Sequence, residues 1–483
     1  MRHLAAPEGA GAMEAPDALG ESGSASCGDL VRIALRIGGG RVREARFQAF
    51  GCGAATAAAS AACGRLAGAS MDDALRLSAD SLDHDLGGLG EARRHGPEIV
   101  EDAVARALES WYSSRLGRHG LPQRADRVAV AMSGGVDSAV AAMLLRDAGL
   151  DVVGVTMRLW HDPAAAAAER SCCSPETVRL ARRSAHALDI PHLTLDVAET
   201  FRAGVVEDFI EGYRSGRTPN PCVTCNGSVR FRILAEAAAL VGARQLATGH
   251  YARVARPGGR GAVVSRAADA GKDQSYMLAM LDERIRERVT FPLGGLAKAR
   301  VRETARAAGL PAADAVESQE VCFVGEGGYA PFLERAAGMA PRPGPIEDAA
   351  GRRLGTHAGY WRYTVGQRRG VGVAGAEPLY VLGTDPGRNA VTVGPREALA
   401  TDGIALRPAR VFGELGDEPL EVRLRYRGRP LRGRASADGA GLRIDLIDSA
   451  DGAAPGQTAA LYRDGRLIAA GTIAAPDIPE SEA

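Results

Sequence analysis

The sequence has almost no lysine, no long hydrophobic run and no net charge. Its 59 basic residues are nearly all arginines, and lysine stands only at positions 272 and 298. In such a background a retained lysine can mark a site that needs a compact ammonium group. No run of 18 apolar residues occurs, which argues against a membrane-spanning helix. The first 26 residues lack the order of a signal peptide, so we expect a cytoplasmic protein.

The balanced charge and the cysteine content limit which kinds of partner and site are expected. A net charge of zero gives no overall attraction to nucleic acid, so any RNA-binding surface must be local. The eight cysteines of a cytoplasmic chain are expected to be thiols, ligands or nucleophiles rather than structural disulfides.

A chain of 483 residues is expected to form several domains. Residues 1–26 are rich in Gly, Ala, Ser and Pro and are predicted to be a disordered arm. Residues 27–115 combine two alternating stretches with later helical patterns, which indicates a small α+β domain. Residues 125–330 alternate buried strands with helices, which is typical of a doubly wound α/β domain with a parallel sheet. The remainder predicts a small linking domain over 331–402 and a β-barrel over 403–477.

A glycine-rich turn, AMSGGVDS, follows the first buried strand of the α/β domain and precedes a helix. Backbone N–H groups at such a turn can bind phosphate oxygens, and Asp137 could hold Mg²⁺ against them. The turn is shorter than the mononucleotide P-loop and has no lysine. The candidate nucleotide-binding residues are Ala131, Met132, Ser133, Gly134, Gly135, Val136, Asp137 and Ser138.

The SGGVDS string resembles the loop of the PP-loop ATP pyrophosphatases, which cleave ATP between the α- and β-phosphates. Five further strings, GRTPNPCVTCN, ATGHYARV, GKDQSYML, ESQEVCFVG and YTVGQRRGVGV, follow in order. Together they resemble the bacterial tRNA-specific 2-thiouridylases over roughly residues 125–475. The resemblance implies that sulfur replaces the C2 oxygen of the wobble uridine in tRNAs for Lys, Glu and Gln. It implies ATP as a substrate, and a cysteine desulfurase or another persulfide donor as a partner.

Two cysteines in PNPCVTCN, Cys222 and Cys225, have a spacing that suits a metal site, a redox couple or a nucleophile. The resemblance implies that Cys322 carries the persulfide and that Cys225 is the nucleophile that ends in a disulfide with it. Cys222 stands where some members of the family have an aspartate, and it is a candidate acid/base group or target-base contact. One alternative is a [4Fe–4S] cluster held by all three cysteines. Another is an iron–sulfur or sulfur carrier whose ATP site is regulatory.

The same resemblance assigns further binding residues. Met157 and Gly249 are implied to contact the adenine and ribose of ATP. Arginines and aromatic side chains are what RNA backbones and unstacked bases require. The implied tRNA contacts are Asn220, Pro221, Cys222, His250, Lys272, Asp273, Gln274, Arg425, Tyr426 and Gln457. For the other lysine, Lys298, we expect only a helix-capping role.

The strings CGDLVRIALRI and FGCGAATAAASAACGRLAG resemble the iron–sulfur scaffolds of the IscU and NifU N-terminal type. In that family three cysteines and an Asp or His hold a transient cluster, and Cys27, Asp29 and Cys52 match. The third cysteine should follow a histidine, but here His95 is followed by Gly96.

The missing cysteine leaves two interpretations of this front module. It can hold iron or a [2Fe–2S] cluster only if the histidine reaches the site. Separately, Cys63, which lies one helix along, is a candidate substitute for the missing thiol. Alternatively it no longer assembles clusters and docks a cysteine desulfurase close to Cys322.

Overall fold

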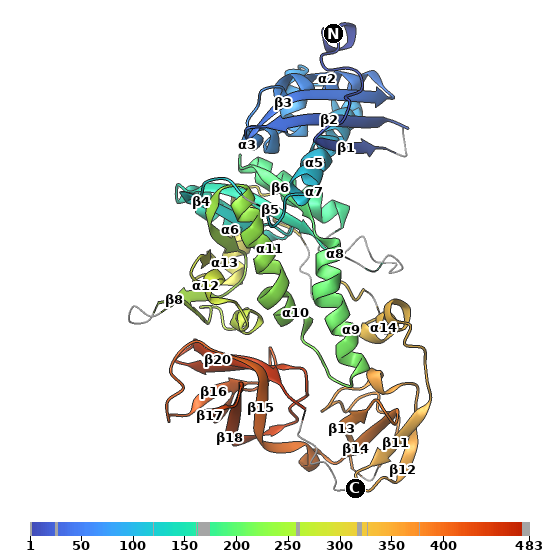
Figure 1. Ribbon diagram of the computed structural model, residues 1–483, viewed down its shortest axis with the longest axis vertical. Helices are drawn as coiled ribbons and strands as arrows, with labels where there is room; N and C mark the ends of the chain where they lie inside the picture. Colours follow the sequence, from blue (N-terminus) through green and yellow to red (C-terminus); the bar gives the residue numbers. More distant parts are fainter. Residues whose placement is uncertain are drawn as a thin grey trace.

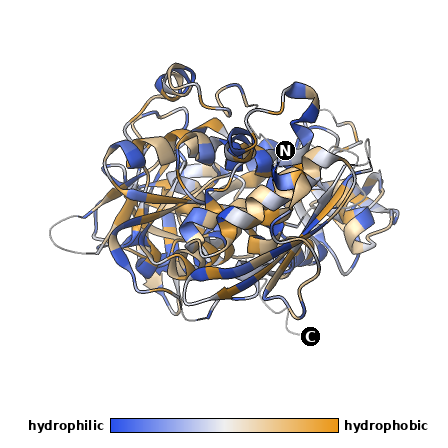
Figure 2. Ribbon diagram, turned by 90° about the horizontal axis from the view of Figure 1, so that it is seen from above, coloured by the Kyte–Doolittle hydropathy of each residue, from blue (hydrophilic) through white to orange (hydrophobic). Residues whose placement is uncertain are grey.

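The computed structural model describes residues 2–24, 28–118, 120–160, 162, 174–256, 261–315, 321–325, 327–375 and 377–475. Figure 1 shows a stacked arrangement, with the N-terminal module above a parallel sheet and two β-rich units below it. Hydrophobic and hydrophilic stretches alternate along most elements in Figure 2, as expected for elements with one buried face. Within the described ranges, no helix combines the length and the apolar character that crossing a membrane requires.

The N-terminal module is a three-stranded antiparallel sheet covered by helices, with strand order β1-β2-β3. Its helices pack on one face of the sheet, where the alternating apolar residues of the strands are buried. Its elements are α1 (Arg2–Ala5), β1 (Ala18–Gly23), β2 (Leu30–Gly38), β3 (Arg41–Phe50), α2 (Gly53–Leu66), α3 (Met71–Leu75), α4 (Ala79–Asp85) and α5 (His95–Ser113).

The prediction that residues 1–26 form a disordered arm is wrong for residues 2–24. Strand β1 pairs with β2 from Ala18↔Leu35 to Gly23↔Leu30. Its alternate residues are buried beneath α5, and a Cβ atom on Gly20 would lie 2.1 Å from the carbonyl oxygen of Ala103. The small residues that made this segment look disordered therefore let the α5 backbone pack directly against the strand.

The second unit, called the catalytic unit below because the resemblance implies that it is catalytic, contains a five-stranded sheet. The strand order is β10-β7-β4-β5-β6, and each neighbouring pair is parallel. Val128 and Val130 of β4 pack into one hydrophobic cluster, whereas Ala129 packs into another, so both faces are covered. This confirms the doubly wound α/β prediction. The elements are β4 (Arg124–Ala131), α6 (Val136–Asp147), β5 (Asp151–Arg158), α7 (Pro175–Ala187), β6 (His192–Asp196), α11 (Phe231–Leu240), β7 (Ala243–Thr248), β10 (Val289–Thr290) and α13 (Lys298–Ala307).

A long helical segment descends from this sheet toward the β-rich units (Figure 1). It joins α8 (Ala198–Phe201), the π-helical segment η3 (Arg202–Val206) and α9 (Glu207–Arg214). A second segment joins α10 (Pro221–Thr224), the π-helical segment η4 (Cys225–Arg230) and α11. The two π segments contact each other, so the cysteine-bearing turn is held against the descending helix.

The C-terminal part contains a small sheet and a closed barrel. The small sheet has the order β12-β11-β14-β13 and follows α14 (Tyr329–Ala337). The barrel runs β15-β18-β17-β16-β19-β20 and closes through β15–β20, which confirms the predicted β-barrel. A hairpin of the catalytic unit, β8–β9, adds to β20. Bounds are β8 (Arg253–Ala255), β9 (Val263–Ser265), β11 (Gly344–Asp348), β12 (Arg353–His357), β13 (Tyr380–Asp385), β14 (Ala390–Gly394), β15 (Ala400–Val411), β16 (Leu420–Arg423), β17 (Leu431–Asp438), β18 (Gly441–Asp451), β19 (Thr458–Arg463) and β20 (Arg466–Ile473).

Ion pairs fix the N-terminal module to the catalytic unit. Arg182 of α7 pairs with Glu101 at 2.8 Å and also with Asp102, both on α5. Arg127 of β4 pairs with Asp72 at 2.6 Å. The side chains of Arg182 and Glu101 are each 9% exposed, so this contact is a buried interface and not a flexible tether.

Candidate active site

The glycine-rich turn lies between the end of β4 and the start of α6, at the carboxyl edge of the parallel sheet. Gly134 has a φ of 78°, and a Cβ atom there would lie 2.4 Å from the carbonyl oxygen of Thr177. Only glycine fits this conformation so close to α7. Gly249 directly follows β7, and a Cβ atom there would lie 2.8 Å from the carbonyl carbon of Asp137. The predicted nucleotide-side residues 131–138 and Gly249 therefore lie together.

The two serines of the turn hold its shape. The Ser138 hydroxyl accepts a hydrogen bond from the Ser133 N–H at 3.1 Å and donates one to the Gly135 carbonyl at 3.0 Å. These bonds keep the turn open at the N-terminus of α6, where backbone N–H groups can bind an anion.

Asp137 is held by two side chains from distant parts of the chain. The Lys298 ammonium lies 2.7 Å from each carboxylate oxygen, and the Tyr251 hydroxyl donates to Oδ1 at 2.8 Å. The Lys298 N–H also donates to Asp269 at 3.0 Å where α13 begins. The expectation that Lys298 only caps a helix is wrong. The scarcity of lysine was the signal that could have found it.

Beneath the turn, the Thr156 hydroxyl donates to the Met132 carbonyl at 2.7 Å and lies 2.8 Å from Nε2 of His192. Burial lowers the pKa of His192, so the ring is neutral. The sequence did not predict this buried link between β5, β6 and the turn. Met157, the predicted adenine contact, is half-buried at the end of β5.

The three cysteines of the catalytic unit occupy different environments. Cys222 is exposed on α10, Cys225 is buried at the first position of η4, and Cys322 is half-buried. The Asn220 side chain caps α10 by accepting from the Val223 N–H at 3.3 Å. π-Helical segments are frequent at functional sites, and no residue pattern predicted this one.

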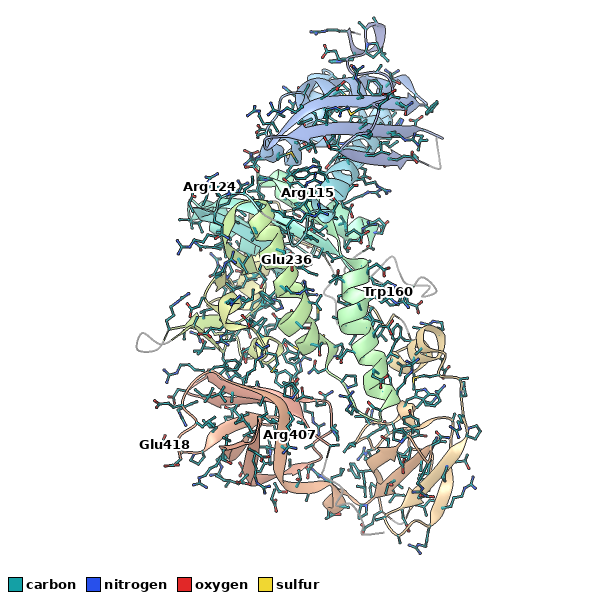
Figure 3. All side chains as sticks on the ribbon, viewed as in Figure 1. Arg115, Arg124, Trp160, Glu236, Arg407 and Glu418 are labelled. Carbon is teal, nitrogen blue, oxygen red and sulfur yellow. The ribbon has the colours of Figure 1, made fainter. Side chains whose placement is uncertain are left out.

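Cys225 and Cys322 share one hydrophobic cluster, in which Cys225 is a member and Cys322 packs against it. Phe323, next to Cys322, packs edge-to-face against Phe332, with the ring centroids 5.4 Å apart. Phe332 packs in the same way against Trp160, with the ring centroids 6.3 Å apart. Figure 3 labels Trp160 beside the descending helix. The described cysteines form no disulfide with one another, and Cys172 and Cys173 lie outside the described residues.

Among the described residues, Cys222, Cys225 and Cys322 do not form a group whose ligand atoms all lie within 4.8 Å of one another. They are therefore not arranged around a single shared ion. The thiolates of a [4Fe–4S] cluster bind different irons and lie farther apart, so that alternative stays a prediction.

The loop 272–274 is built around Asp273. Its buried carboxylate accepts from the N–H groups of Ala267 at 3.1 Å and Ser275 at 3.2 Å. The Gln274 side chain accepts from the Tyr251 N–H at 2.8 Å. Asp273 and Gln274 therefore shape the loop that presents the partly exposed Lys272.

His250, a predicted tRNA contact, sits in an aromatic setting. Its Nδ1 lies 2.7 Å from the Thr248 hydroxyl, and its ring lies 6.0 Å from Phe231 and 6.2 Å from Phe291. Burial, together with the charge of Arg230, lowers the pKa of His250 to about 3. The ring is therefore neutral at physiological pH.

The barrel is joined to the PNPC turn through Gln457. Its amide donates to the carbonyl oxygens of Thr218 at 2.9 Å and Pro219 at 3.3 Å. The Thr218 N–H donates to the Pro455 carbonyl at 2.8 Å. Gln457, predicted to contact tRNA, therefore also positions the cysteine-bearing turn, with Pro221 buried at the start of α10.

The other predicted barrel contacts lie nearer solvent. The exposed Arg425 donates to the Asp451 carbonyl at 3.3 Å. Tyr426 is half-buried, and its ring centroid lies 6.3 Å from that of Tyr276. The guanidinium carbon of Arg427 lies over the Tyr426 ring, 5.6 Å from its centroid. An arginine and a tyrosine side by side provide a cation and a stacking face.

The N-terminal module carries a separate donor group. Asp29, Cys52 and His95 each offer a ligand atom, and these atoms lie within 4.8 Å of one another. His95 therefore reaches the site, as one sequence interpretation required. Cys27 lies outside the described residues. The proposed substitute Cys63 is wrong, because it is buried in the module core and burial raises its pKa to about 12.

Four family models match successive parts of the chain. They are described as a NifU-like N terminal domain over residues 1–117, a tRNA methyl transferase HUP domain over 126–326, a tRNA methyl transferase PRC-barrel domain over 331–395, and an aminomethyltransferase beta-barrel domain over 405–473. The first match begins before residue 27, in agreement with the ordered strand β1.

Whole proteins match as well. The bifunctional protein NifU/MnmA of Rubrobacter xylanophilus is 42% identical over 98% of this chain and 97% of its own length. The tRNA-specific 2-thiouridylase MnmA of Chloroflexus aggregans is 44% identical over 73% of this chain and 99% of its own. The enzyme of the same name from Maricaulis maris is 45% identical over 74% of this chain and 90% of its own. The chain therefore belongs to the MnmA family of tRNA-specific 2-thiouridylases, in the bifunctional form that carries a NifU-like domain in front.

Proposed function

We propose that the chain converts the wobble uridine of tRNAs for Lys, Glu and Gln to 2-thiouridine, at the expense of ATP. The observation that carries this proposal is that one parallel-sheet unit contains both a PP-loop turn at the start of α6 and two thiols, Cys225 and Cys322, that pack into the hydrophobic core. A small-molecule adenylating enzyme needs the turn but has no use for these thiols.

The first step activates the base. The uridine C2 oxygen attacks the α-phosphorus of ATP, and pyrophosphate leaves, so that AMP becomes the leaving group on C2. The N–H groups at the start of α6 bind the phosphates. The Lys298 ammonium adds positive charge where negative charge develops. Asp137 is the residue that would hold Mg²⁺, which would neutralise phosphate charge, and its carboxylate is the kind of ligand this ion prefers.

The second step transfers sulfur. A donor such as a cysteine desulfurase loads Cys322 as a persulfide, whose terminal sulfur attacks C2 and displaces AMP. The product is joined to Cys322 through an S–S bond. The Cys225 thiolate then attacks the Cys322 sulfur, which releases 2-thiouridine and leaves a Cys225–Cys322 disulfide. A thiol reductant restores both thiols. Cys222, exposed on α10, is the candidate proton carrier or base contact.

The tRNA lies against the loop of Lys272, the PNPC turn and the Arg425–Tyr426 edge of the barrel. Lys272 and Arg425 provide charge for phosphates, and Tyr426 provides a stacking face. Because His250 is neutral, its contact with tRNA would be packing or hydrogen bonding and not a salt bridge.

For the N-terminal module we propose a delivery role, in which it docks the sulfur donor. The buried ion pairs of Arg182 and Arg127 support this role, because a donor bound to the module would be held at a fixed place on the enzyme.

The direct test is in vitro thiolation. Unmodified tRNA for Glu is incubated with ATP, cysteine, a cysteine desulfurase and the chain, and the nucleosides are analysed by mass spectrometry. We expect 2-thiouridine at the wobble position, with AMP and pyrophosphate as products. Formation of ADP, or no sulfur in the tRNA, would refute the proposal.

A further inference from the structure

Helix α7 begins directly against the nucleotide turn. The Ser174 hydroxyl caps this helix by accepting a hydrogen bond from the Thr177 N–H at 3.2 Å. A Cβ atom on Gly134 would lie 2.4 Å from the Thr177 carbonyl oxygen, so the two backbones are in contact. With no flexible side chain between them, a shift of the first turn of α7 must also move the glycine-rich turn.

One face of the same helix is bound by the N-terminal module, where the module meets the sheet (Figure 1). Arg179, Arg182 and His186 are three and four residues apart and therefore lie on one side of α7. Arg179 pairs with Asp102 at 2.8 Å, and Arg182 pairs with Glu101 at 2.8 Å and also with Asp102. Nδ1 of His186 lies 3.4 Å from Oε1 of Glu101.

The other side of α7 packs on the catalytic unit. Ala181 and Ala185 are fully buried and share a hydrophobic cluster with Val136, the first residue of α6. The helix also contacts α6, β5 and β6. It is therefore held between the module and the sheet, and its first turn supports the nucleotide turn.

The contact between the module and α7 is rigid, and it lies at the edge of the sheet that carries the turn. Glu101 is fixed inside the module, because its Oε2 accepts from the Ala79 N–H at 3.0 Å. The side chains of Glu101 and Arg182 are each 9% exposed. The other ion pair between the units, Arg127 with Asp72, lies at the amino edge of the sheet, where Arg127 is in register with the first residue of β5.

We propose that the N-terminal module is part of the ATP site, because through α7 it holds the nucleotide turn in its binding shape. Glu101 and Arg182 act as positioning residues in this arrangement. The inference rests on the proposed function, since it takes the turn to bind ATP. If the module contact loosens, the first turn of α7 can move away from Gly134, and the N–H groups of the turn lose their fixed orientation toward the phosphates. Coupling between binding sites is reciprocal, so ATP in turn strengthens the contact between the module and α7.

Binding of α,β-methylene ATP, which cannot be cleaved between those phosphates, tests this coupling in the full-length chain. Glu101→Gln combined with Arg182→Met removes both charges, so neither is left buried without its partner. By calorimetry we expect the Kd for the analogue to rise at least about fivefold, with the Kd for tRNA almost unchanged. Amide hydrogen exchange, measured well below the unfolding temperature, should become faster at residues 133–138 and stay the same in β7.

The matched control is Asp72→Asn combined with Arg127→Met, which removes an ion pair of the same interface at the opposite edge of the sheet. This variant should keep both the analogue affinity and the slow exchange at residues 133–138. The milder Asp102→Asn variant leaves the Glu101 pair in place and should shift both measurements less, in the same direction, which gives a second test if the double variant is misfolded by circular dichroism.

Two outcomes would overturn the inference. One is unchanged analogue affinity and unchanged exchange at residues 133–138 in the folded Glu101/Arg182 variant. The other is an equal loss in the Asp72/Arg127 control, because the effect would then come from any weakening of the interface and not from α7. Failure of the unmodified chain to bind the analogue is a different result, since it would refute the proposed function and with it this inference.

Discussion

Lys298 and Asp137, 161 residues apart in the chain, form an ion pair in which the ammonium lies 2.7 Å from both carboxylate oxygens. The lysine side chain is 11% exposed, and it contacts Asp137, the second residue of α6 and a member of the AMSGGVDS string. One of the two lysines of the chain is therefore placed where the ATP phosphates are expected.

Replacing Lys298 should impair the first chemical step. Lys298→Met removes a fixed positive charge from the phosphate site, and we expect pyrophosphate release to fall by about 10²-fold, which is typical of one electrostatic transition-state contact. Asp137→Ala should have a similar effect. Lys298→Arg should restore little of the pyrophosphate release, because a planar guanidinium does not replace a compact ammonium at a buried position.

The other lysine is the control for this prediction. Lys272→Met should raise the KM for tRNA and leave the maximal rate of pyrophosphate release within a few fold. Equal losses of maximal rate in the Lys272 and Lys298 variants would contradict the assignment of separate roles.

Serine variants should separate sulfur chemistry from binding. Cys225→Ser and Cys322→Ser should each abolish 2-thiouridine formation while tRNA affinity stays within a few fold, because they remove a thiol and not the contact surface. Filter binding and nucleoside mass spectrometry measure the two properties. Cys63→Ala should retain thiolation, and thiolation near the wild-type rate in either serine variant would refute the assignment.

Gln457→Ala should reduce turnover more than tRNA affinity. The substitution removes two hydrogen bonds to the turn that precedes Cys222 and Cys225, each worth about 1 kcal/mol. We expect a several-fold lower rate of thiolation at saturating tRNA. An increase in the tRNA Kd with an unchanged rate would show that the side chain acts only as a tRNA contact.

The docking interface should weaken in acid. Burial alone would raise the pKa of Glu101, but the hydrogen bond from His186 and the charge of Arg182 lower it to about 2, from 4.5. The stability from ionised Glu101 is therefore full above about pH 4.5 and is lost as the pH falls toward 2. Thermal unfolding measured between pH 5 and pH 3 should show this loss. The Glu101→Gln variant should have a lower unfolding temperature at pH 5, and its unfolding temperature should change less with pH.

Removing the N-terminal module should separate sulfur delivery from catalysis. A chain that begins near residue 120 should still thiolate tRNA with excess sulfide, because the 2-thiouridylase of Chloroflexus aggregans matches 73% of this chain over 99% of its own length. With a desulfurase and cysteine as the source, we expect most of the rate to be lost. Equal desulfurase-driven rates for the short and full-length chains would reject the delivery role.

Short local sequence patterns were sufficient to predict the fold of the catalytic unit and its nucleotide-binding turn. A glycine-rich turn between a buried strand and a helix needs only neighbouring residues to form, and alternating strands and helices predict the parallel sheet. The SGGVDS turn, the cysteines of PNPCVTCN and the barrel could therefore be predicted from the sequence alone.

Only the tertiary structure decided the relationships between distant segments. Composition predicted disorder for residues 1–26, yet the small residues of β1 are ordered because α5 packs on them. The contact of Lys298 with Asp137 and the convergence of Asp29, Cys52 and His95 join residues from separate elements. Their placement depends on how helices and strands pack, and packing is set by the shapes of many side chains together, which no local pattern of residues encodes.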